Sequence, residues 1–182
     1  EYDRFMVDVV CPNAAATSGK DTHTTHNVVY FQSFPCLRVQ LPALFANLRP
    51  HVDAMYNHPP SGLHYYLPLT PHIYDTGTLQ LETSPGANDF KPLELRYGEF
   101  ARFAGSILAH YTVGNRTRKT RMSIDCRAVV PELLDDHSAK HYKAGEYYSV
   151  ATRVQGETKF SLTTHGAVSG QHGFPFVFTA PR

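Results

Sequence analysis

Two histidines and an aspartate in this chain have the residue types and the spacing of a mononuclear iron site. His51 and Asp53 are separated by one residue, so on an extended segment both side chains project to the same side. His110 follows much later, far enough along to lie on another strand of the same barrel. Two imidazoles and one carboxylate on one face of an iron ion leave adjacent positions open for other ligands. We therefore predict that His51, Asp53 and His110 bind a metal ion.

An arginine and a serine further along the chain could bind an anion beside this metal. If Lys119 to Arg127 is a strand, its alternation places Arg121 and Ser123 on one face, where a guanidinium and a hydroxyl can hold one carboxylate. A buried arginine stays charged, so its burial is costly unless an anion pairs with it. A dicarboxylate that chelates iron at one end and meets Arg121 at the other satisfies both groups. The compound 2-oxoglutarate fits this description.

The order of these residues resembles that of the Fe(II)/2-oxoglutarate-dependent oxygenases, whose pattern is His-x-Asp, a distal His and Arg-x-Ser. The chain is similar in particular to the subgroup that includes the StrG-type protein of streptomycin biosynthesis. The resemblance runs from about Val28 to Val130 and is carried by Phe34 to Pro42, His51 to Pro60, Tyr66 to Thr70 and Leu93 to Phe103. The subgroup often has acids two positions after the ligand Asp and after the Pro-rich turn, where this chain has Met55 and Ser61-Gly62.

The resemblance implies a particular cofactor set and reaction. Fe(II) would be held by His51, Asp53 and His110, and 2-oxoglutarate would be gripped at its far carboxylate by Arg121 and Ser123. With O₂, the expected reaction releases succinate and CO₂ and oxidises a C–H bond of the substrate, usually by hydroxylation. The implied substrate is a small polar metabolite.

Residues around the predicted metal site are candidates for contacts with the organic ligands. The hydroxyl of Tyr66 could meet an oxygen of 2-oxoglutarate, or the ring could simply pack in the core. Arg38 and Gln40 share one face of a predicted strand, which either reaches substrate or co-substrate or is a solvated outer face. The predicted substrate-binding residues are Arg38, Gln40, Tyr56, His58 and His64.

Turn residues at short intervals separate many short apolar runs, which predicts an all-β chain with few short helices. The family resemblance implies that this fold is a double-stranded β-helix, a jelly roll of the cupin type. Two segments are predicted without strands: Cys11 to Asp21 is a loop, and Glu132 to Asp136 opens a short helix or turn. The predicted strands are Asn27 to Gln32, Leu37 to Leu41, Leu63 to Leu69, Thr78 to Glu82, Lys91 to Leu95, Glu99 to Phe103, Ile107 to Val113, Arg121 to Val129, and one or two edge strands within Val150 to Thr163.

Composition limits the partners and the location of the protein. A length of 182 residues suits one domain, with a core at about residues 26–130 and a C-terminal extension at 131–182. The net charge of +1 gives no long-range field for polyanions, so we expect no nucleic-acid partner. The cysteines, 3 in number and without paired spacing, favour a reducing, cytoplasmic compartment, and no apolar run is long enough to span a membrane. Composition does not predict the oligomeric state.

Two other functions remain compatible with the same residues. A non-catalytic cupin-like or lectin-like binding module could keep His51 and His110 as structural or zinc-binding residues, and it would need no anion site. An isomerase without net redox chemistry could use the same fold. The pair Arg121 and Ser123 distinguishes the oxygenase hypothesis from the binding module, because only the oxygenase needs to hold a second carboxylate.

Overall fold

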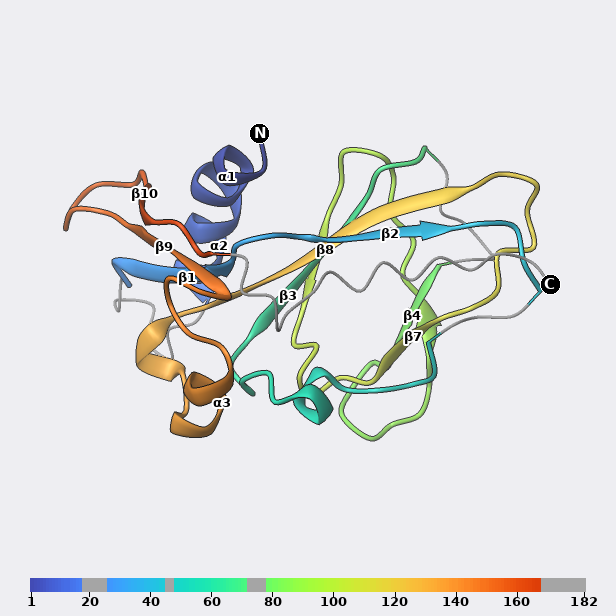
Figure 1. The fold of residues 1–182 in the computed structure, drawn as a ribbon. Coiled ribbons are helices and arrows are strands. Elements are labelled where there is room, and N and C mark those ends of the chain that lie inside the picture. Colours follow the sequence, from blue (N-terminus) through green and yellow to red (C-terminus); the bar gives the residue numbers. More distant parts are fainter. Residues whose placement is uncertain (18–25, 45–47, 72–77, 168–182) are drawn as a thin grey trace. The chain divides into compact units, whose positions relative to one another are not determined.

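A computed structural model describes residues 1–17, 26–44, 48–71 and 78–167, and these residues form mostly β-sheet with few helices (Figure 1). The strands are β1 (Val28–Gln32), β2 (Cys36–Gln40), β3 (Leu63–Pro68), β4 (Leu79–Leu81), β5 (Lys91–Pro92), β6 (Ala101–Phe103), β7 (His110–Thr112), β8 (Arg121–Val129), β9 (Tyr148–Thr152) and β10 (Ser161–Thr164). The helical elements are α1 (Tyr2–Phe5), the π-helix η1 (Met6–Val10), α2 (Cys11–Thr17), the 3-10 helices η2 (Asp53–Tyr56) and η3 (Pro131–Leu133), and α3 (Asp136–His141).

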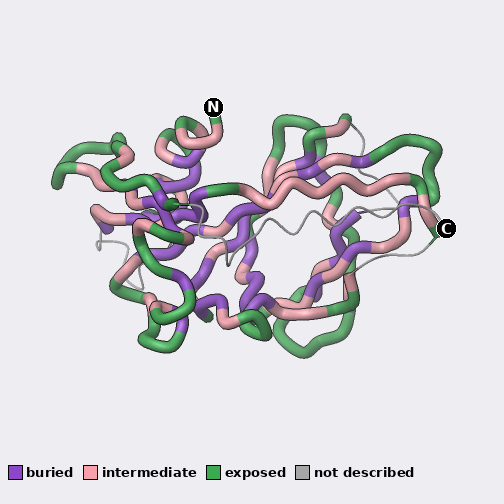
Figure 2. Tube along the Cα trace, in the orientation of Figure 1, coloured by how far each residue is buried: buried purple, intermediate pink, exposed green. Residues whose placement is uncertain are grey.

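The strand predictions are confirmed in position, although several strands are shorter than predicted. Each range predicted between residues 27 and 129 overlaps an observed strand, and β9 and β10 account for the predicted edge strands. The long strand β8 spans the full predicted range. Buried and partly buried residues alternate over its first half, and most residues of its second half are buried (Figure 2). The helix or turn expected at Glu132 to Asp136 is also present, as η3 and the start of α3.

The loop predicted for Cys11 to Asp21 is wrong in its first part, because residues up to Thr17 form α2. This helix continues directly from α1 and η1, and the π-helical stretch Met6–Val10 comes just before Pro12, which cannot donate a backbone hydrogen bond. The alanines after Pro12 favour helix strongly, and two of them, Ala14 and Ala15, are buried with Met6 and Val10, so no large apolar residues mark α2 in the sequence. Ser18 to Asp21 lie outside the described residues.

The chain divides into two compact units, and the prediction of a single domain stays a prediction. Unit 1 comprises Glu1–Phe34, Asn57–Leu63 and Cys126–Gly173. Its antiparallel strands β10, β9 and β1 lie side by side, and β1 also pairs with the last residues of β8. The core of this unit includes Val129, Tyr142 and Tyr148.

Unit 2 comprises Pro35–Tyr56, His64–Asp125 and Phe174–Arg182, of which the last segment lies outside the described residues. The first half of β8 pairs with β2 on one side and β3 on the other, and β6 follows β3. A second sheet of unit 2 has the order β5-β4-β7. Its core cluster contains Tyr66, Leu79, Leu95 and Phe103, so β3, β4 and β6 each bury an apolar side chain in it.

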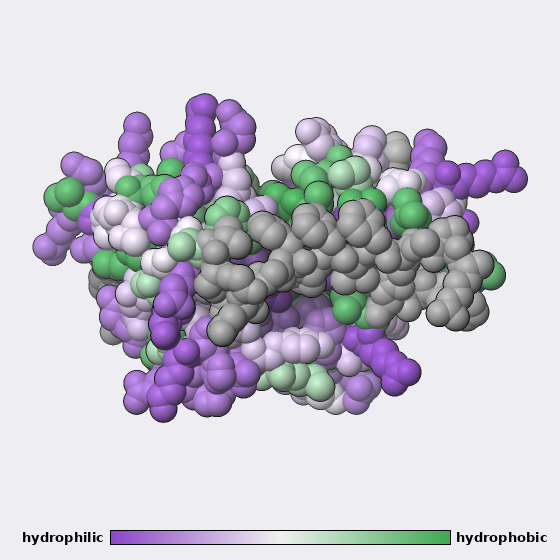
Figure 3. All heavy atoms as spheres, in the orientation of Figure 1, coloured by the Kyte–Doolittle hydropathy of each residue, from purple (hydrophilic) through white to green (hydrophobic). Residues whose placement is uncertain are grey.

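The surface shows how the polar and apolar residues are distributed. On the face drawn in Figure 3, hydrophobic and hydrophilic residues are interspersed outside the grey atoms.

All three cysteines are free, and Cys11 and Cys126 are buried in unit 1. In the described part of the chain, no helix is both long and apolar enough to cross a membrane.

Candidate functional site

His51, Asp53 and His110 come together in unit 2. One ligand atom from each of the three residues lies within 4.8 Å of the others. Asp53 and His110 are buried, whereas His51 is partly exposed. These three side chains are thus close enough to share one ion, and that they bind a metal stays a prediction.

Backbone hydrogen bonds hold the three residues in place. His51 and His110 form an isolated antiparallel bridge, in which the His110 N–H donates to His51 O at 2.9 Å and the His51 N–H donates to His110 O at 3.2 Å. The Asp53 N–H donates to Gly105 O at 2.9 Å. The predicted extended segment is only half right, because the chain leaves the bridge after His51 and Asp53 begins η2. The 3-10 turn is stabilised by tertiary contacts that the alternation pattern does not contain.

Both histidines present the same ring nitrogen for metal binding. The His51 Nδ1 lies 2.8 Å from Arg49 O, and the His110 Nδ1 lies 3.0 Å from Leu108 O. A carbonyl oxygen only accepts, so each Nδ1 carries the proton and each Nε2 keeps its lone pair in the neutral ring. Burial, followed by the nearby His64, lowers the pKa of His110 to about 4. His110 is therefore neutral at physiological pH, as a metal ligand must be.

The predicted anion site lies on β8 and β3 of unit 2. Arg121 and Ser123 are both buried on one face of β8, as the alternation predicted. Among the residues that the structure describes, no hydrogen-bond partner exists for Arg121 Nε and Nη1, Ser123 Oγ or Tyr66 Oη. The Arg121 Cζ lies 5.9 Å from the centre of the Tyr66 ring. A buried cation and two buried hydroxyls, none with a partner for the atoms named among the described residues, have the chemistry to bind an oxygen-rich anion.

A cavity links Tyr66 to His51 and His110. Its walls include His51, His110 and Tyr66, and its apolar lining includes Leu48 and Leu79. All of these residues belong to unit 2. The lining also includes Arg38, His64, Thr112 and Asp125, so charged and polar side chains surround the cavity together with apolar ones. Apolar surface with a few polar groups is usual in small-molecule sites.

The carboxylate of Asp125 is the feature that the sequence reasoning missed. Asp125 follows Arg121 and Ser123 on the same buried face of β8, and that continued alternation was the available signal. It is 1 % exposed and forms a two-bond ion pair with Arg38, through Nε–Oδ1 and through Nη2–Oδ2 at 3.1 Å. Burial opposes its ionisation, but Arg38 and His64 outweigh burial and hold the pKa of Asp125 well below its usual range.

The predicted substrate-binding residues occupy different places. Gln40 lies opposite Arg121 in the β2–β8 register and donates to Val113 O at 2.6 Å. Tyr56 is exposed and packs edge-on against His51, with ring centres 5.7 Å apart. His58 belongs to unit 1, where its ring stacks on Tyr142 at 4.2 Å. Their roles in substrate binding stay predictions, as do those of Arg38 and His64.

Comparison with known proteins gives one relative in sequence and several in structure. The chain is 29% identical over 153 residues to the streptomycin biosynthesis protein StrG of Streptomyces griseus, and the match covers 81% of this chain and 72% of StrG. No family model matches the chain.

Solved structures with a similar fold include two enzymes. A nickel complex of the non-heme monooxygenase ThoJ has a TM-score of 0.51 at 17% identity and is matched over 71% of this chain. The non-heme alpha ketoglutarate dependent epimerase SnoN from nogalamycin biosynthesis has a TM-score of 0.52 at 14% identity, over 93% of this chain and 69% of SnoN. The chain spans only 53% of the ThoJ chain. This chain is therefore similar to StrG in sequence, and in fold to a non-heme monooxygenase and to a non-heme alpha ketoglutarate dependent epimerase.

Proposed function

We propose that this chain is an Fe(II)- and 2-oxoglutarate-dependent oxygenase that oxidises a small polar metabolite, on a double-stranded β-helix fold. The observation that carries the proposal is the combination, within unit 2, of a His-Asp-His cluster with buried polar atoms that have no partner among the described residues. The similarity to StrG and to the fold of SnoN and ThoJ supports it.

The residues present fit an iron ion. His51 and His110 would bind through Nε2, because their Nδ1 atoms are engaged with backbone carbonyls, and Asp53 would bind through its carboxylate. Two imidazoles and a carboxylate are the ligands of non-haem Fe(II) oxygenases, and they leave positions for a chelating co-substrate and O₂. With iron, 2-oxoglutarate and O₂ bound, one oxygen atom enters succinate, the other enters the substrate and CO₂ is released.

The buried polar atoms on β8 and β3 that have no partner in the described part of the chain fit the second carboxylate of 2-oxoglutarate. Arg121 would supply a charged, planar set of donors, and Ser123 and Tyr66 would each donate a hydroxyl hydrogen. Tyr66 lines the same cavity as His51 and His110, which connects the anion site to the metal site. The chain's own contribution is thus to orient the co-substrate between the two ends and to limit water in the cavity.

A ligand-binding experiment tests this function without knowledge of the substrate. We expect 2-oxoglutarate to raise the melting temperature of the protein only when Fe(II), or Mn(II) as a redox-stable substitute, is present. Under anaerobic conditions the Fe(II) complex should also show a visible charge-transfer band, and alanine at His51 or His110 should remove it.

Two matched ligands sharpen the same experiment. The analogue 2-oxobutyrate keeps the chelating end but lacks the second carboxylate, so it should stabilise the protein less than 2-oxoglutarate does. Stabilisation by metal alone, with no added effect of 2-oxoglutarate and no band, would support a non-catalytic metal-binding module instead. Succinate release across pools of small molecules would then identify the substrate and separate an oxygenase from an isomerase.

A further inference from the structure

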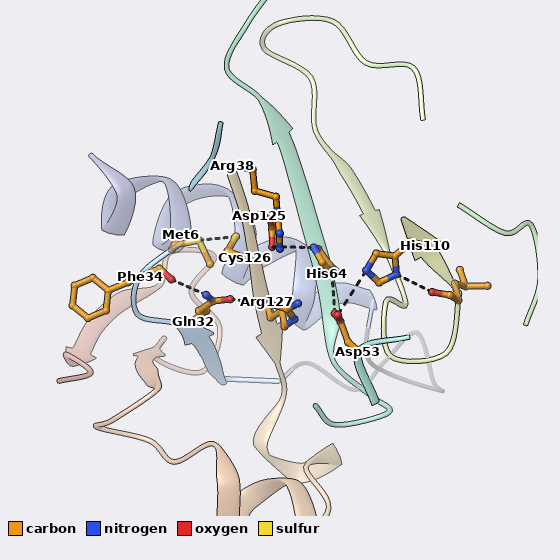
Figure 4. A network of polar contacts seen from close by, with 11 residues as sticks. Met6, Gln32, Phe34, Arg38, Asp53, His64, His110, Asp125, Cys126 and Arg127 are labelled. Carbon is orange, nitrogen blue, oxygen red and sulfur yellow. Dashed lines mark hydrogen bonds and ion pairs between the residues drawn. The ribbon is translucent and has the colours of Figure 1, made fainter. Parts of the chain in front are cut away.

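A chain of charged and polar side chains runs from the β2–β8 pair to the metal-binding aspartate. Figure 4 shows Arg38 beside Asp125, Asp125 beside His64, and His64 beside Asp53. The His64 Nδ1 lies 2.9 Å from Asp53 Oδ2, and its Nε2 lies 3.5 Å from Asp125 Oδ2. A carboxylate oxygen accepts, so the ring donates to Asp53. Asp53 therefore accepts a hydrogen bond from His64 on Oδ2, one of its two carboxylate oxygens.

The other oxygen of Asp53 faces the predicted ligands. Asp53 Oδ1 lies 3.7 Å from the His110 Nε2, which is the nitrogen that keeps its lone pair. Oδ2 is thus the oxygen beside His64, and Oδ1 is the oxygen beside His110. Without His64, rotation about the Asp53 side chain could exchange the two oxygens.

Packing fixes the His64 ring in this orientation. The ring stacks on Phe103, its cross-strand partner in the β3–β6 pair, with centres 4.6 Å apart and planes 17° apart. It also meets the His110 ring edge-on at 5.3 Å. His64 is 4 % exposed, so solvent does not compete for its ring nitrogens.

Gly105 leaves the space that the hydrogen bond requires. A Cβ at position 105 would lie 2.8 Å from His64 Nδ1 and 3.0 Å from Asp53 Oδ2, closer than real Cβ contacts allow. The carbonyl of the same glycine accepts the Asp53 N–H. Backbone and side chain of Asp53 are thus both constrained at the place where the His64 contact forms.

We infer that His64, anchored by Asp125 and Arg38, is a positioning residue that holds Asp53 with Oδ1 toward the metal. The inference rests on the proposed function, since it concerns the same ion. Such outer partners orient metal ligands and raise metal affinity. A purely structural role would instead affect folding and leave the affinity of the folded protein unchanged.

Substitution of His64 separates these two roles. Phenylalanine keeps the stack on Phe103 but removes the donor, and we expect Co(II) to bind His64→Phe about 10–100-fold more weakly than the native chain. Asparagine places an amide N–H near the position of Nδ1, so His64→Asn should bind Co(II) within about threefold of the native chain. Glutamine places its N–H near the position of Nε2, so His64→Gln should bind as weakly as His64→Phe. The readouts are the Co(II) dissociation constant and the d–d absorption spectrum.

A matched control is available in unit 1. His26→Phe makes the same change at another buried histidine beside a carboxylate, with its Nδ1 3.6 Å from Glu132 Oε2, and Co(II) affinity should not change. The melting temperature of each metal-free variant reports folding separately. If His64→Phe does not fold, the contrast between His64→Asn and His64→Gln decides the question.

Native Co(II) affinity in a folded His64→Phe, or equal affinity in His64→Asn and His64→Gln, would overturn the positioning role and leave the proposed function standing. If the native chain itself bound no divalent metal, both would be overturned.

Discussion

Replacing Arg121 with methionine is expected to stabilise the ligand-free protein and to destroy its affinity for 2-oxoglutarate. Arg121 is 5 % exposed, and its Nε and Nη1 have no hydrogen-bond partner among the described residues. Methionine has a similar length and no polar hydrogen, so it can fill the same space without an unsatisfied donor. Under the proposed function, the burial of Arg121 costs stability in the free protein and this cost is offset when 2-oxoglutarate binds.

The expected magnitudes follow from these contacts. Each unsatisfied buried donor costs about 1–3 kcal/mol. The cation–π contact of Arg121 with Tyr66, at 5.9 Å, stabilises the folded protein by only about 1 kcal/mol. The variant should therefore gain at least about 1 kcal/mol, which raises the melting temperature by about 2–4 °C in a domain of this size. Loss of one partner of a buried charge pair costs the complex about 2–5 kcal/mol, or a roughly 30- to 4000-fold weaker affinity for 2-oxoglutarate.

Calorimetric titration of Mn(II)-loaded protein with 2-oxoglutarate measures the affinity, and scanning fluorimetry of the metal-free protein measures the stability. Arg118→Met is the matched control, because it removes the same charge from an exposed position three residues earlier. It should change neither quantity. A lower melting temperature together with unchanged 2-oxoglutarate affinity in Arg121→Met would refute the argument and would identify Arg121 as a structural residue.

Two further outcomes follow from the titrating groups. Because the pKa of His110 is lowered from 6.5 to about 4 in the folded state, metal-free protein should lose stability as the pH falls from about 6.5 to about 4. Urea unfolding at several pH values should show a smaller loss for His110→Gln, and an equal loss would contradict the buried, neutral state. Asp135 caps α3 by accepting from the Ser138 N–H at 2.9 Å and from its hydroxyl at 2.8 Å, so Asp135→Ala should cost about 1 kcal/mol of unfolding free energy. These hydrogen bonds to Ser138 lower the pKa of Asp135 from 3.8, so the cost should be full above that pH and fade as the carboxylate is protonated; a pH-independent cost would argue against the cap.

Local patterns in the sequence predicted most of the strands and the composition of the site. Alternation along β8 was sufficient to place Arg121 and Ser123 on one buried face, because side chains in a strand alternate with a period of two. The same reasoning was incomplete for Asp53, which begins a 3-10 helix held by the carbonyl of Gly105. It also failed for α2, because the buried residues of this helix are small and give little periodic signal in the sequence.

The residue types needed for metal and anion binding were therefore determined by the sequence alone. Only the tertiary structure decided which side chains meet. His64 was predicted to contact substrate, and the pairing of β3 with β6 and β8 brings its ring nitrogens to Asp53 and Asp125 while the residue also lines the cavity. Arg38 was predicted to bind a ligand, and the β2–β8 register sets it beside Asp125 in the lining of the same cavity. Their substrate contacts stay predictions. Strand partners and register depend on contacts between residues far apart in the chain, so the periodicity of a single strand does not contain them.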